Sequence, residues 1–186
     1  MIDFSSQLKR HQSWLVIYAL AIITVGIASG IIWNRIVTLP AYHIGEGFRA
    51  HIPESGLAQL AATDVVFCFV GMIAGLLIGT IGWVLLKSLD WVVTLLAGFG
   101  GLFAGILALL TGALIGPKDF DQRIAQATPG DEVLVDFAAG TWVPLTLWVG
   151  VAVVPVLIGS LIQSEKWVSH EPADESSAPV EEESVE

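Results

Sequence analysis

The chain has 186 residues, of which 54% are hydrophobic and only 14% are charged, and its formal net charge is −10. Soluble domains carry roughly 25% charged residues, so this composition excludes a soluble enzyme. Binding of nucleic acid needs clustered Lys and Arg, and the acidic balance therefore predicts no nucleic-acid partner. The single cysteine, Cys68, excludes an intrachain disulfide.

Four uncharged apolar runs follow one another along the chain, at residues 14–33, 65–86, 91–115 and 142–162. Each reaches the length of about 20 residues that an α-helix needs to cross about 30 Å of hydrocarbon. Strands of an outer-membrane barrel would instead show alternating apolar and polar residues. We therefore predict an all-α fold, an integral membrane four-helix bundle over residues 14–162.

The first run follows a short N-terminal segment, residues 1–13, that contains Lys9 and Arg10. This arrangement resembles a signal peptide, but the apolar stretch of 14–33 is longer than the 7–15 residues of a secretory segment. We interpret it as a retained first helix.

The first long loop, residues 34–64, repeats a short His/Glu pattern. The copies are His43-Ile44-Gly45-Glu46 and His51-Ile52-Pro53-Glu54. Either these four polar groups hold a divalent metal such as zinc, or they are solvated loop groups. Glycine and proline within the copies oppose a helix that would align the four groups. We favour the second interpretation and predict no metal site.

The end of this loop allows two starts for the second helix. Residues 57–62 either lead helically into the second run, or the helix begins at a cap formed by Thr63 or Asp64.

Glycines recur at close intervals in the second and third runs, which only residues 87–90 separate. Small residues four apart let helix backbones approach closely where lipid supplies no hydrophobic drive. We predict that these two helices pack antiparallel as a tight hairpin. The helix-packing residues are Gly71, Gly75, Gly79, Gly98, Gly101 and Gly105.

The second long loop, residues 116–141, contains a turn signal at Thr128-Pro129-Gly130-Asp131. Residues 132–137 then form either a short strand or a segment along the membrane surface. Asp119 and Asp121 have the alternate spacing of calcium loops, but the rest of that motif is missing.

The two ends and the short turn are predicted to be cytoplasmic, with both long loops outside. Lys9, Arg10, Lys87 and Lys166 lie close to helix ends on that side, whereas the four bases of the long loops are more dispersed. The acidic tail, residues 163–186, should be mostly disordered, because the part from His170 has too little apolar surface to fold. Tryptophans mark the expected membrane boundaries: Trp14, Trp33, Trp83, Trp91, Trp142 and Trp167.

The four runs contain no Asp, Glu, Lys, Arg or His. Ionisable groups within a membrane mark ion pathways and proton relays, and a haem would need an axial His or Met. We therefore predict no catalytic residue, no cofactor and no enzyme activity.

Several segments resemble those of small four-span membrane proteins from actinobacteria. They are Ala62-Thr63-Asp64 at the start of span two, the glycine-rich hairpin, the acidic segment 119–136, and Trp142-Val143-Pro144 at the start of span four. Some proteins of this type are accessory subunits of the cytochrome bcc–oxidase respiratory supercomplex. The resemblance implies a plasma-membrane location and partners among respiratory complex subunits.

Two hypotheses for the function follow. The first is a non-catalytic accessory or structural subunit that packs beside larger integral membrane proteins and lipid. The alternative is a small carrier or channel for a neutral or apolar solute, with the mid-span Pro155 as a gate. Under the first hypothesis a few aromatic and arginine anchors carry the binding energy. The partner-binding candidates are Tyr42, Phe48, Arg49, Phe120, Arg123 and Trp148.

Overall fold

The computed structural model describes residues 4–47 and 49–168, with the side chains of residues 12–47 and 49–163. Residues 169–186 of the predicted disordered tail lie outside the described residues. Along the chain the elements are α1 (Phe4–Ile36), β1 (Ala41–Ile44), β2 (Ala50–His51), α2 (Glu54–Leu86), the 3-10 turn η1 (Lys87–Leu89), α3 (Val92–Ile115), α4 (Phe120–Ala125), β3 (Glu132–Leu134) and α5 (Val143–Val168).

Four of these helices, α1, α2, α3 and α5, are long and apolar enough to cross a membrane. The predicted helical class and the number of membrane-length helices are thus confirmed. Helix α2 begins at Glu54, eleven residues before the apolar run at 65, because residues 57–62 are good helix formers. The alternative with a cap at Thr63 or Asp64 is wrong, since both lie inside α2.

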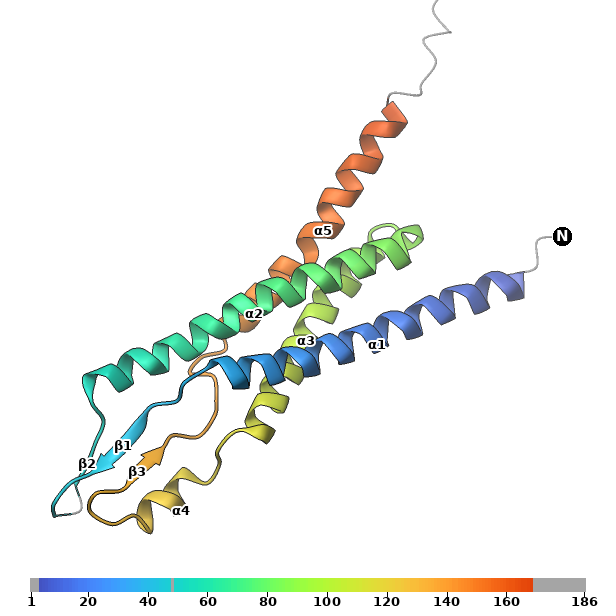
Figure 1. The fold of residues 1–186 in the computed structure, drawn as a ribbon. Coiled ribbons are helices and arrows are strands. Elements are labelled where there is room, and N and C mark those ends of the chain that lie inside the picture. The colour runs from blue at the N-terminus through green and yellow to red at the C-terminus, as the bar shows by residue number, and fades with distance from the viewer. Residues whose placement is uncertain (1–3, 48, 169–186) are drawn as a thin grey trace, which may run out of the picture.

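The short α2–α3 connection and the two long loops lie at opposite ends of the bundle (Figure 1). The α2–α3 connection lies at the same end as the start of α1 and the end of α5. The strands and α4 lie at the other end. Helix α2 packs most extensively against α5, and α1 against α3, whereas α2 and α3 share a smaller contact.

The two long loops join in one small antiparallel sheet with the strand order β2-β1-β3. His43 of β1 lies opposite His51 on one side and opposite Glu132 on the other. Together with α4 these strands form the cap, a name used below for β1, β2, α4 and β3. The alternative of a short strand for residues 132–137 is confirmed for Glu132–Leu134.

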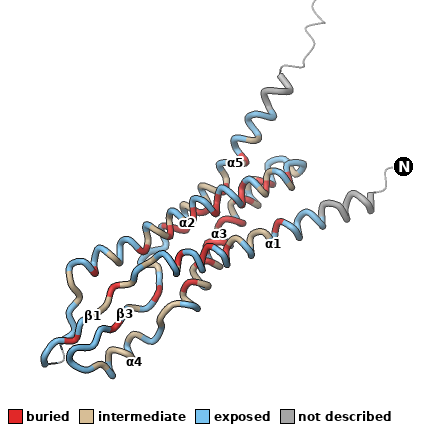
Figure 2. The backbone as a smooth tube through the Cα atoms, in the orientation of Figure 1, coloured by how far each residue is buried: buried red, intermediate tan, exposed pale blue. Residues whose placement is uncertain are grey.

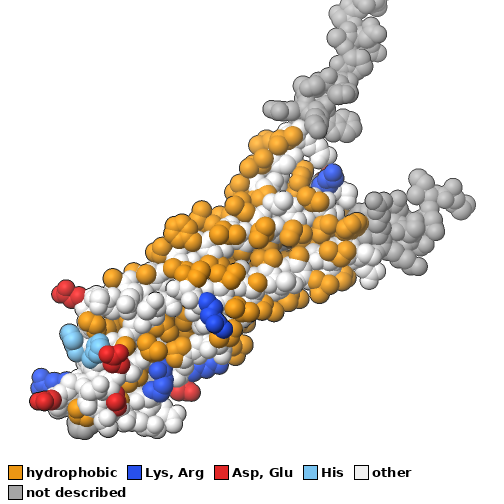
Figure 3. Space-filling view, viewed as in Figure 1, with side chains coloured by type: hydrophobic (Ala, Val, Ile, Leu, Met, Phe, Trp, Pro, Cys, Tyr) orange, Lys and Arg blue, Asp and Glu red, His pale blue; other side chains and the backbone are white. Residues whose placement is uncertain are grey.

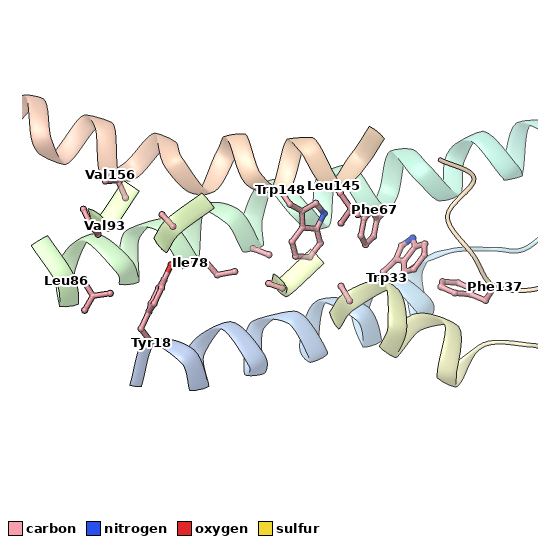
Figure 4. Close-up of a cluster of buried hydrophobic side chains, with 14 residues drawn as sticks. Tyr18, Trp33, Phe67, Ile78, Leu86, Val93, Phe137, Leu145, Trp148 and Val156 are labelled. Atoms are coloured by element: carbon pink, nitrogen blue, oxygen red, sulfur yellow. The ribbon is translucent and has the colours of Figure 1, made fainter. Parts of the chain in front are cut away.

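The core runs along the middle of the bundle and continues beneath the cap (Figure 2). Its large side chains include Tyr18, Trp33, Phe67, Ile78 and Trp148 (Figure 4). Between them the buried positions of α3 are alanine and glycine apart from Val93. The outward faces of the helices are covered by apolar side chains (Figure 3), as in a protein surrounded by lipid.

Candidate functional site

The cap is a folded unit with an inner and an outer face. Successive strand residues point to opposite sides, and Tyr42, Ile44 and Val133 belong to the inner face, with Ile44 and Val133 buried. The Tyr42 ring packs on Phe120 of α4 at a centroid distance of 5.3 Å. This contact brings two predicted partner-binding residues together, and each ring covers part of the surface of the other.

Arg123 has the central structural task in the cap. Its guanidinium donates hydrogen bonds to the carbonyl oxygens of Lys118 and Leu134, both at 2.8 Å, and to Asp136 Oδ1 at 3.0 Å. Asp136 Oδ1 also accepts the amide of Phe120 at 3.0 Å. The sequence showed no obvious task for Arg123 within the chain, but its planar donor fork ties α4 to β3.

The remaining loop candidates differ in position. Arg49 is exposed, and it makes no ion pair within the described part of the chain. Phe48 lies outside the described residues. Gly47, which precedes these positions in the sequence, has φ +84°, a conformation that L side chains rarely adopt.

The outer sheet face, defined here as His43, His51, Glu132 and Leu134, points away from the bundle core. All four residues are exposed, and His43 Nδ1 lies 3.2 Å from Glu132 Oε1. The repeated His/Glu pattern of the sequence is therefore split, because Glu46 lies in a turn and Glu54 starts α2. Within the described residues, no three His, Cys, Asp or Glu side chains gather as metal ligands would.

A turn at the edge of the cap is held by Asp131. Its carboxylate accepts the amide of Thr128 at 2.7 Å and the Thr128 hydroxyl at 2.8 Å. These two hydrogen bonds, the one from the amide foremost, lower the pKa of the Asp131 carboxyl. Gly130 within this turn has φ +99° and donates its N–H to the Ile44 carbonyl at 2.8 Å.

Trp33 at the end of α1 joins α2 to the segment that follows β3. Its ring lies 4.3 Å from that of Phe137 and 4.7 Å from that of Phe67, and its indole N–H donates to the Thr63 carbonyl at 3.1 Å. We predicted Trp33 at the membrane boundary. It is at a helix end but fully buried, because Phe67 of α2 and Phe137 pack against it.

A second anchor joins α2 to the segment before α5. The Asp64 carboxylate accepts the Gly140 amide at 2.8 Å and the Thr141 hydroxyl at 3.4 Å. This pairing over 76 residues of sequence gives Asp64, a carboxylate in the interior of α2, a structural task.

The six glycines lie at helix contacts, but their partner differs from the expected one. A side chain at Gly71 or Gly79 would collide with Trp148 or Ala152 of α5, and one at Gly75 would come within 3.1 Å of the Trp148 carbonyl oxygen. The expectation that the glycines of α2 and α3 face each other is wrong, because α5 lies between the two rows.

The three glycines of α3 also face α5. A Cβ at Gly101 would lie 2.6 Å from the Trp148 carbonyl oxygen, and one at Gly105 would lie 2.6 Å from Leu145. At Gly98 the nearest atoms, in Val149 and Val153, are 3.7 Å away, which is ordinary contact. The short turn does make α2 and α3 neighbours, yet the glycine rows of both helices pack against α5 rather than against each other.

Trp148 is the residue on which this packing centres. It is fully buried, and its ring stacks on Phe67 at 5.2 Å. The sequence left open whether it faces a partner, lipid or the bundle core, and the structure places it in the core. Its indole N–H has no hydrogen-bond partner among the described residues.

Several hydroxyl groups of the long helices bond within their own helix. Thr24, Thr80 and Ser160 each donate to a carbonyl of their own helix at 2.7–2.9 Å. The Tyr18 hydroxyl bridges two helices, donating to the Leu96 carbonyl at 3.3 Å.

Two features of this site lay beyond sequence reasoning. The pairing of β1 with β3 joins residues about 90 positions apart, and the cross-links made by Arg123 and Asp64 join segments whose proximity the sequence pattern does not indicate. The comparison of this chain with protein-family models, curated proteins and solved structures finds no match.

Proposed function

We propose that this protein is a non-catalytic accessory or structural subunit of a larger membrane protein complex. The observation that carries this proposal is the cap: two loops far apart in sequence form one sheet. The segment between β3 and α5 is held to the helices by the contact of Phe137 with Trp33 and by the hydrogen bonds that Asp64 accepts. A folded surface of this kind is pre-organised, and pre-organisation lowers the entropic cost of binding a partner.

The outer sheet face and Arg49 provide the proposed docking surface. Charged and histidine side chains gather at the cap end of the molecule (Figure 3), whereas the helical shaft is apolar. Leu134 is 44% exposed beside this polar set. Interfaces combine such an apolar contact with a polar rim and one or two arginine anchors.

The proposed location is the plasma membrane, with four spans and both termini cytoplasmic. In this orientation Lys87 in the α2–α3 connection lies on the cytoplasmic side, as the positive-inside rule favours. The cap then faces outward. The resemblance to small actinobacterial four-span proteins names the respiratory bcc–oxidase supercomplex as the candidate complex.

The test is purification of the tagged chain in a mild detergent, with identification of the proteins that remain bound. We expect larger respiratory subunits in stoichiometric amount. Arg49→Ala and Leu134→Asp should weaken the association by about 1 kcal/mol or more, whereas Gln122→Ala on exposed α4 and removal of residues 171–186 should leave it intact. A chain that purifies alone in every mild detergent, and moves a solute across vesicle membranes, is a carrier instead.

A further inference from the structure

A cleft opens between α5 and the α2–α3 connection, at the end of the bundle away from the cap. It has a volume of about 410 Å³ and is called the turn cleft below. Figure 1 shows α5 leaving the other helices at this end. Two buried side chains in its lining, Val93 of α3 and Val156 of α5, belong to the core (Figure 4).

The position of the turn cleft along the helices matches the headgroup level of a bilayer. The candidate span containing α2 ends at Leu89 and the next begins at Val92, so the cleft lies where two spans meet water. Trp83 and Trp91 line it, and tryptophan is the residue type enriched at this depth. An occupant at this level is in contact with both the headgroup layer and the hydrocarbon.

The lining carries one charge of each sign. Lys87 and Asp90 both line the turn cleft, and within the described residues neither takes part in an ion pair with the other or with a third group. Thr94 and Ser160 add hydroxyl groups. The Ser160 hydroxyl already donates to the Leu157 carbonyl at 2.9 Å, so its oxygen remains as an acceptor.

An apolar groove continues from the turn cleft toward the middle of the membrane. It lies between α3 and α5, has a volume of about 290 Å³, and shares Thr94 with the cleft. Gly98 and Phe99 of α3 and Val153 of α5 are among its lining residues. The missing side chain at Gly98 leaves this groove open, since the nearest atoms to a Cβ there are 3.7 Å away.

We propose that the turn cleft and this groove bind one phospholipid whose headgroup carries both a phosphate and a primary ammonium, that is, a phosphatidylethanolamine. Lys87 pairs with the phosphate, and Asp90 accepts hydrogen bonds from the ammonium, an arrangement that charge-assisted hydrogen bonds favour. An acyl chain lies in the groove over Gly98. A choline headgroup has no N–H to donate to Asp90, and a glycerol headgroup has no positive charge.

The proposal is tested by native mass spectrometry of the full chain in detergent with added dioleoyl phosphatidylethanolamine, phosphatidylcholine or phosphatidylglycerol. We expect retention of the ethanolamine lipid to exceed that of the choline lipid about tenfold, the effect of one charged hydrogen bond. Lys87→Gln should lower retention of the ethanolamine and glycerol lipids alike. Asp90→Asn should lower retention of the ethanolamine lipid only. Asparagine tolerates the positive φ of 49° at this position.

Two controls separate the site from general effects. Arg35→Gln removes a cation at the other end of α1 and should change nothing. Gly98→Leu should fill the groove and reduce retention of every diacyl lipid, whereas Gly150→Leu, at a position with nothing within 4 Å, should not. Soluble glycerophosphoethanolamine should fail to displace the lipid.

Equal retention of all three lipids would overturn the proposal, as would unchanged retention in both charge variants. Displacement by the soluble headgroup would identify a site for a water-soluble ligand and contradict a lipid site. Gel filtration establishes that each variant is folded. If a charge variant unfolds, the comparison of Gly98→Leu with Gly150→Leu decides, and equal retention in these two contradicts the proposal.

Discussion

Trp148 of α5 fills the space that a side chain at Gly71 of α2 would need. A Cβ built at Gly71 would collide with the indole ring, which is itself fully buried against Phe67. The absence of a side chain at Gly71 thus leaves the space that the Trp148 indole occupies. This relationship positions α5 across both glycine rows.

Gly71→Ala should therefore destabilise the bundle by about 1–3 kcal/mol, the usual cost of overpacking a core. Gly150→Ala is the matched control, because a Cβ at that position meets nothing within 4 Å. Thermal unfolding in detergent measures both variants. Equal unfolding temperatures would show that Trp148 does not occupy the space above Gly71.

The anchor beneath the cap gives a second prediction. Phe137 is buried, its ring lies 4.3 Å from that of Trp33, and a side chain at Gly116 would collide with it. Phe137→Ala should cost about 3–5 kcal/mol, as large truncations in a core do. Unfolding in a denaturing detergent measures the loss. Val135→Ala, at a half-buried position two residues earlier, should cost less, and a larger cost there would contradict the proposed anchor.

Arg123 should stabilise the cap through geometry as well as charge. Arg123→Ala should raise amide hydrogen exchange in β3 and α4, and Arg123→Lys should rescue little, since lysine lacks the planar donor fork. Arg49→Ala, a change at an exposed arginine, should leave this exchange unchanged. Full protection in Arg123→Lys would mean that a positive charge alone suffices.

The Thr128–Asp131 turn predicts a dependence on pH. The pKa of Asp131 is lowered in the folded state by the Thr128 amide and hydroxyl, so its stabilising contribution is present above the unfolded pKa and is lost as pH falls through the folded value. Hydrogen exchange at the Thr128 amide should increase with acidification relative to the intrinsic rate. In Asp131→Asn this acid-dependent step should disappear. A step that persists would assign the titration to another group.

Topology is tested with single cysteines in a chain carrying Cys68→Ser. Ser55 and Gln126 are exposed positions at the cap end. Cysteine at either position should react with a membrane-impermeant thiol reagent in intact cells. Reaction only after lysis would place the cap in the cytoplasm and reverse the proposed orientation.

The helices were predictable from sequence because each apolar run is long enough to exclude other structures. The start of α2 was not fixed by the sequence, since residues 54–64 mix apolar and polar side chains and interrupt the apolar run. The cap was not predictable as a sheet: β2 has only two residues and β1 four, and such short strands become visible only when they pair. The two loops were therefore treated as separate.

Which helices pack against each other was also not predictable from the sequence. A helix that is apolar on every side carries no periodic signal for the face it buries, so the burial of Trp148 could not be told from exposure to lipid. Glycine rows on α2 and α3 indicated close packing correctly, but such rows do not name their partner. The four-residue turn favoured a direct α2–α3 seam, whereas both glycine rows pack against α5.

The central claim, that the cap docks on another membrane protein, is tested most directly by photo-cross-linking in intact membranes. A photoreactive residue is placed at Leu134 on the outer sheet face, and at Thr24, an exposed position in the middle of α1, as control. The account predicts that Leu134 forms an adduct with one defined membrane protein, reduced by Arg49→Ala, and that Thr24 does not form this adduct. A chain that is folded and abundant but gives no protein adduct from Leu134 would contradict the claim.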